Sequence, residues 1–126
     1  MSNEWLKSAT LDLENIKHII NEPHLSPVVA FHAHQAIEKS FKAIFEMKEI
    51  TVPKKHDLVG LFEILKDNNL FININENLLE ILNKLYIDSR YPGEFGLLPE
   101  GIPSLTQSEE FYNLSKLIFN EIKKIE

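Results

Sequence analysis

The chain has 126 residues, of which 44% are apolar and 25% are charged, a balance typical of one globular domain and not of a disordered chain. It contains no cysteine, which excludes disulfides, cysteine-ligated zinc and a cysteine nucleophile. The net charge of −6 argues against tight, non-specific binding to duplex nucleic acid, which requires many lysine and arginine contacts with phosphates.

The N-terminal residues do not combine a basic region with an apolar stretch, so no secretion signal is predicted. No uninterrupted apolar run approaches the roughly 18–20 residues that a membrane-spanning helix needs. We therefore expect a soluble, cytoplasmic protein without a membrane partner.

Helical spacing of apolar residues predicts two long helices in the first half of the chain. The first is expected over residues 3–21, ended by Pro23, and the second over residues 26–48, with Ser26 as a cap and Pro27 in the first turn. The inward stripe of the first comprises Trp5, Ala9, Leu13, Ile16 and Ile20. That of the second comprises Ala30, Ala33, Ile37, Phe41 and Ile44.

Three more helices are predicted in the second half. A short one is expected over residues 57–67 with Asp57 as N-cap, and another over residues 75–89, while residues 71–77 are ambiguous and include a candidate extended piece. A final helix is predicted from Thr106, which has the capping-box spacing to Glu109. The expected inward residues are Leu58, Leu61, Phe62, Leu65, Leu78, Leu79, Leu82, Leu85, Tyr86, Phe111, Leu114, Ile118, Ile122 and Ile125.

These elements predict an all-α fold, an up-and-down antiparallel helical bundle of four long helices plus one short helix, in a single domain over residues 1–126. Residues 90–104 form a connection that is long for such a bundle and contain several glycines and prolines. Long ordered loops are often functional, so this segment is a candidate part of a site.

The second predicted helix carries two polar faces: His32, Gln35 and Lys39 on one, and His34, Glu38 and Lys42 on the other. One interpretation is a polar groove that offers donors to a phosphate or a base. The alternative, more frequent for this spacing, is a solvated face with ion pairs four residues apart. A dedicated metal site is not expected, because His32 and His34 diverge on a helix and no second histidine completes a ligand pair.

Two further segments are candidate anion contacts. Lys54 and Lys55 precede His56 and Asp57 at a predicted helix N-terminus, where main-chain amides favour anions, although Asp57 as a cap would compete with a phosphate. Arg90, the only arginine, can bind a phosphate through two hydrogen bonds or offset a helix dipole. For each of these two segments, the anion-binding interpretation and the purely structural one both stay open.

Three segments in order resemble HEPN domains: Ala30-Phe31-His32-Ala33-His34-Gln35-Ala36-Ile37-Glu38-Lys39-Ser40-Phe41-Lys42-Ala43, then Lys55-His56-Asp57-Leu58, then Ser89-Arg90-Tyr91-Pro92. The resemblance implies an antiparallel helical bundle that usually forms a homodimer. It also implies a prokaryotic protein, often encoded beside a minimal nucleotidyltransferase in a toxin–antitoxin-like pair, and a nucleotide-binding role.

Some members of that family are metal-independent ribonucleases with an arginine followed four to six residues later by a histidine. That motif is absent here, because Arg90 is the only arginine and the last histidine is His56. Tyr91 is a poor substitute as a general base, since tyrosine ordinarily titrates at about pH 10. We therefore do not expect the ribonuclease activity of those relatives, although His32 or His34 beside Arg90 would make a different arrangement.

The favoured hypothesis is a binding module without a cofactor that holds a nucleotide or RNA phosphate. The alternatives are an endoribonuclease with a non-standard site and a non-catalytic protein-interaction subunit. The expected ligand-binding residues are His32, Gln35, Lys39, Lys42, Lys55, His56, Arg90 and Tyr91.

Overall fold

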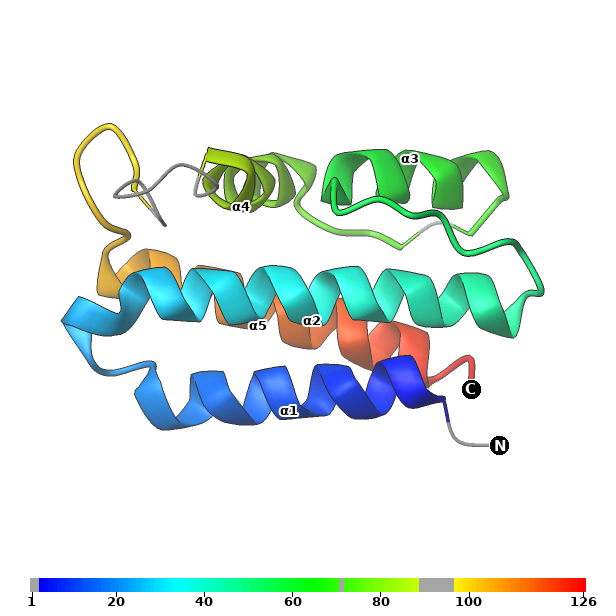
Figure 1. Ribbon diagram of the computed structural model, residues 1–126, viewed down its shortest axis with the longest axis horizontal. Helices are drawn as coiled ribbons and strands as arrows, with labels where there is room; N and C mark the ends of the chain where they lie inside the picture. Colours follow the sequence, from blue (N-terminus) through cyan, green and yellow to red (C-terminus); the bar gives the residue numbers. More distant parts are fainter. Residues whose placement is uncertain (1–2, 71, 89–96) are drawn as a thin grey trace.

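The computed structural model of the chain describes residues 3–70, 72–88 and 97–126, without the side chains of residues 87 and 88. The described part is helical, as predicted (Figure 1). Its elements are α1 (Glu4–Ile19), a short 3-10 turn η1 (Pro23–Leu25), α2 (Ser26–Met47), α3 (Leu58–Asp67), α4 (Glu76–Asp88) and α5 (Leu105–Lys123). Residues 72–75, where an extended piece was considered, adopt no regular structure.

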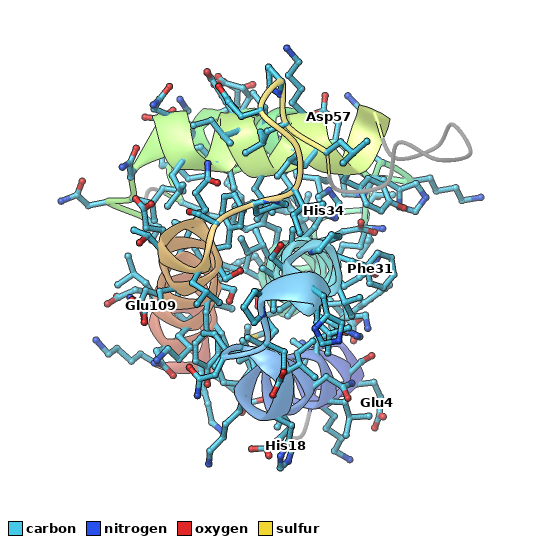
Figure 2. The ribbon with its side chains drawn as sticks, turned by 90° about the vertical axis from the view of Figure 1, so that its left-hand side faces the viewer. Glu4, His18, Phe31, His34, Asp57 and Glu109 are labelled. Atoms are coloured by element: carbon cyan, nitrogen blue, oxygen red, sulfur yellow. The ribbon has the colours of Figure 1, made fainter. Side chains whose placement is uncertain are left out.

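Helix α2 is the centre of the molecule. It packs against α1 on one side and against α5 on a second, and α3 and α4 cover a third (Figures 1 and 2). Most α2 residues are buried, because three sides of this helix face other elements. None of the helices in the described ranges is long and apolar enough to cross a membrane.

Successive helices do not simply alternate in direction. Segment 48–57 returns along α2, so that α3 then runs in the same direction as α2 (Figure 1). Two contacts fix this register: His56 meets Glu38, and further along both helices Phe62 stacks on Phe41 with ring centroids 5.9 Å apart. The all-α prediction is confirmed, but the strict alternation of an up-and-down bundle is not.

Helix caps agree with the sequence at Asp57, whose side chain accepts the amide of Val59. The predicted cap at Ser26 is wrong: η1 runs directly into α2, and the amide of Ser26 donates to the carbonyl of Pro23. The extra turn therefore replaces a side-chain cap.

The predicted capping box at Thr106 and Glu109 is also wrong. Ser104 caps α5, accepting the amide of Gln107 at 3.1 Å, while the Gln107 side chain accepts the amide of Ser104 at 2.9 Å. The capping box thus has the expected three-residue spacing but begins two residues earlier, immediately after Pro103.

The predicted inward stripes form the core. Every residue expected inward on α2 and α3 is buried, as are the main stripe residues of α4 and α5. The exception is Ile125, which lies beyond the end of α5 and is exposed. Trp5, Leu13, Ile20 and Leu78 pack against the core while partly exposed.

Two leucines provide a matched test of this core. Leu61 is fully buried, whereas Leu11 is 66% exposed on α1. We expect Leu61→Ala to lower the free energy of unfolding by about 2–5 kcal/mol, because it removes buried methyl groups and leaves a cavity. Leu11→Ala should change it by less than about 0.5 kcal/mol. Urea unfolding followed by circular dichroism measures both, and equal effects would contradict the assigned core.

Candidate functional site

A strip of half-buried residues runs along the side of α2 that borders solvent, between α1 and the α3–α4 layer. Phe31, His32, Gln35 and Lys39 are all half-buried and follow one another at helical spacing. We call these four residues the α2 edge. Figure 2 shows Phe31 on this open side, while His34 points into the layer between α2 and α4.

On its α1 side, the α2 edge is held by the buried carboxylate of Asp12. His32 Nδ1 lies 2.8 Å from Asp12 Oδ1, and Lys39 Nζ donates to Asp12 Oδ2 at 2.7 Å. One carboxylate therefore neutralises Lys39 and orients the His32 ring while connecting α1 to α2. The two predicted ligand contacts, His32 and Lys39, are brought together by this residue.

On the opposite side, the buried carboxylate of Glu38 has the same role. Lys42 Nζ donates to Glu38 Oε2 at 2.9 Å, and His56 Nδ1 lies 3.0 Å from the same oxygen. The Lys42 side chain is 9% exposed, whereas that of His56 is 68% exposed. The second polar face of α2 is therefore not the solvated helix face considered from the sequence, and His56 is the member that faces solvent.

His34 lies beside this pair and is fully buried. Its ring stacks on Tyr86 of α4 with centroids 3.9 Å apart, and Nδ1 is 3.8 Å from Glu38 Oε1. Burial lowers the pKa of His34 from its ordinary value of 6.5 to about 4, an effect that the nearby Glu38 carboxylate opposes only in part. His34 is thus a neutral ring buried between α2 and α4, behind the residues of the candidate site.

The N-terminus of α3 is occupied by the protein's own groups. Asn83 Oδ1 accepts the amide of Leu58 at 2.9 Å, and Asp57 Oδ1 accepts the amide of Val59 at 3.1 Å. Asn83 Nδ2 in turn donates to Asp57 at 2.8 Å. These contacts favour the capping interpretation of Asp57 over an anion site on the α3 amides.

Lys54 and Lys55 are exposed next to His56 and form no ion pair with any described residue. Gln35 lies on the α2 edge between the two carboxylate clusters. Arg90 and Tyr91 lie outside the described residues, so the structure does not place them relative to the others.

Sequence reasoning missed three residues that organise the site. Asp12 falls between Ala9 and Ile16 in the inward stripe of α1, and a carboxylate at such a position signals a buried partner. Asn83 likewise falls between Leu82 and Leu85 on α4. Tyr86 was predicted as core, and no sequence signal indicates that its ring stacks on His34.

The arrangement has one chemical consequence for a ligand. Because Glu38 engages His56 Nδ1, the other ring nitrogen, Nε2, has no partner among the described residues on a largely exposed ring. An imidazole held in this way can exchange a hydrogen bond or a proton with a bound group. No cluster of three or more histidine, aspartate or glutamate side chains placed to hold a metal ion occurs in the described ranges.

The fold and the site thus define a class of protein. It is a small all-helical domain whose central helix carries histidine and lysine side chains. The family model described as HEPN domain matches residues 2–125, essentially the whole chain, and the protein belongs to this family. Comparisons with the curated proteins and with the solved structures gave no significant match.

The pKa of His34 predicts a pH-dependent stability. Between pH 6.5 and about 4 the unfolded chain binds a proton at His34 that the folded chain does not, so the free energy of unfolding falls as the pH falls. His34→Phe keeps a ring against Tyr86 without this titration. We expect wild type to lose up to about 3 kcal/mol more than the variant over this range. Urea unfolding at several pH values measures this difference, and the same dependence of unfolding free energy on pH in both proteins would contradict the expected role of His34.

The Asp12 cluster gives a second stability test. Asp12→Asn leaves Lys39 and His32 without their carboxylate in a partly buried place, and should lower the free energy of unfolding by about 1–3 kcal/mol. The control is Glu4→Gln, which breaks the exposed pair with Lys7 and should cost less than about 0.5 kcal/mol. Thermal unfolding compares the two, and an unchanged Asp12→Asn protein would show that the cluster does not connect α1 to α2.

Proposed function

We propose that the protein binds a nucleotide or the phosphate of an RNA on the surface formed by the α2 edge and residues 54–56. One observation carries the proposal: the His56 ring is fixed by a buried carboxylate and yet is 68% exposed, beside two exposed lysines. A hydrogen bond at one ring nitrogen fixes the orientation and the tautomer of an imidazole, which leaves the other nitrogen available to a ligand. Membership of the HEPN family supports a role related to nucleotides or RNA in general.

Within this proposal the residues have different parts. Lys55 and His56 are the exposed groups that contact the ligand, Gln35 offers an amide, and Arg90 with Tyr91 completes the phosphate contact. His32 and Lys39 are held by Asp12 and border the ligand from the α1 side. The net charge of −6 favours a short ligand over a long duplex.

We further propose that the protein acts as a homodimer in a prokaryotic cytoplasm, with a minimal nucleotidyltransferase as partner in a toxin–antitoxin-like pair. HEPN domains often dimerise or pair with other proteins, which supports this assembly. A protein-interaction subunit without a small ligand is the alternative. Size-exclusion chromatography with light scattering, of the chain alone and co-expressed with such a partner, distinguishes the assemblies.

The binding proposal predicts a saturable titration with a panel of nucleotides and short single-stranded RNAs. His56→Ala and Arg90→Ala should each weaken binding roughly tenfold or more, because each removes a charge-assisted or oriented hydrogen bond. Lys7→Ala is the control, since Lys7 is exposed on α1 and its side chain pairs only with Glu4 among the described residues. Fluorescence anisotropy measures the affinities. No saturable binding, for the chain alone and with its partner, would refute the proposal.

RNA cleavage without a metal is the second candidate, and the pair of Glu38 and His56 favours it, because a carboxylate that orients a histidine is a common way to prepare a general base. The absent arginine–histidine motif stands against it. The same samples, incubated with a chelator and run on a denaturing gel, decide between the two. Intact RNA excludes cleavage, and fragments that disappear in His56→Ala would establish it.

A further inference from the structure

Lys42, an expected ligand contact, lies among groups of the protein itself. Its side chain is buried, and its ammonium lies 5.5 Å from the centre of the Trp5 ring of α1. Trp5 is itself held in place, since its Nε1 donates to Glu46 at 2.9 Å. The ammonium is thus confined between an aromatic face and Glu38.

Lys42 and His56 share a single oxygen of Glu38. Both contacts are to Oε2, at 2.9 and 3.0 Å, while Oε1 is buried and has no hydrogen-bond partner. The Lys42 ammonium is the cation that balances the charge of this buried carboxylate. An ionised carboxylate can only accept, so His56 Nδ1 must be the donor.

We propose that Lys42 is a positioning residue that acts through Glu38 on His56. By holding Glu38 as a carboxylate, Lys42 keeps the proton of the neutral His56 ring on Nδ1 and leaves the lone pair of Nε2 facing solvent. The orientation of His56 is therefore set from the α1–α2 interface, through a chain of contacts from Trp5 to Lys42 and Glu38. The role for ligand binding rests on the function proposed above, but the state of the ring does not.

Removing the ammonium should change the ring. In Lys42→Met the buried Glu38 has lost its cation, which favours uptake of a proton by the carboxyl group. A protonated carboxyl donates its O–H to Nδ1, and the histidine proton moves to Nε2. Lys42→Arg keeps a cation at this place and should keep the wild-type state.

The test is nitrogen NMR of the imidazole rings, at a mildly alkaline pH where histidines are neutral. We expect wild type and Lys42→Arg to carry the His56 proton on Nδ1, and Lys42→Met to lose that signal. Lys39→Met is the matched control, because Lys39 contacts Asp12 instead of Glu38, and its His56 signals should equal those of wild type. Amide spectra of each variant establish that it is folded.

Either of two results would overturn the proposal. The first is a neutral His56 ring that carries its proton on Nε2 in wild type, which can be seen without making any variant. The second is a folded Lys42→Met protein whose His56 ring signals equal those of wild type. Titration of the same samples with a short single-stranded RNA separates this inference from the proposed function. Lys42→Met should weaken binding roughly tenfold, the scale of one net hydrogen bond. The predicted ring states without RNA binding in wild type would leave the positioning role standing and refute RNA as the ligand of the proposed function.

Discussion

The carboxylate of Glu38 is the group on which the arrangement of the site depends. Moving a carboxylate from water into a protein interior costs on the order of several kcal/mol, so the surrounding chain must supply hydrogen-bond donors. Lys42 provides one from the same helix, and His56 provides the other from the connection that follows α2. Segment 48–57 returns along α2, which places His56 against Glu38 and lets α3 follow in the same direction as α2. The direction of α3 and the position of the exposed imidazole therefore go together.

Stability alone does not explain why polar pairs border α2 on both sides. A buried ion pair contributes little more than apolar side chains of the same size, and often less. Asp12 and Glu38 nevertheless each hold a histidine and a lysine, on either side of a half-buried strip that includes Gln35. The physical benefit of such pairs is orientation, since each fixes an imidazole ring that is partly or largely exposed. Oriented rings of this kind suit the proposed binding surface.

The sequence predicted the helices well because their apolar stripes repeat with a clear helical period. It predicted the helix starts poorly at Ser26 and Thr106, where a neighbouring turn or an earlier serine satisfies the same amides. Local patterns do not reveal which of several equivalent caps a chain uses. The shared direction of α2 and α3 was also missed, because local patterns do not show that segment 48–57 returns along α2 and brings His56 against Glu38, eighteen positions away.

The sequence singled out several polar residues that the structure brings together around α2, but not the carboxylate that each of them contacts. The sequence hypothesis named Lys42 and His56 among the residues of one ligand site, yet gave no indication that one is buried and the other exposed. Burial depends on what α1 and α3 place against α2, which is tertiary information. Asp12 is the opposite case: a carboxylate in an apolar stripe was visible in the sequence, but its partners on another helix were not.

The most direct test of the central claim, that the ligand binds beside His56, is to map where it perturbs the protein. Amide NMR spectra recorded during titration with a short single-stranded RNA give this map residue by residue. The account predicts the largest shifts along the α2 edge and at residues 54–56. Shifts concentrated instead around Leu117 and Lys124 of the C-terminal region, where the surface is hollowed by about 530 Å³, would contradict it.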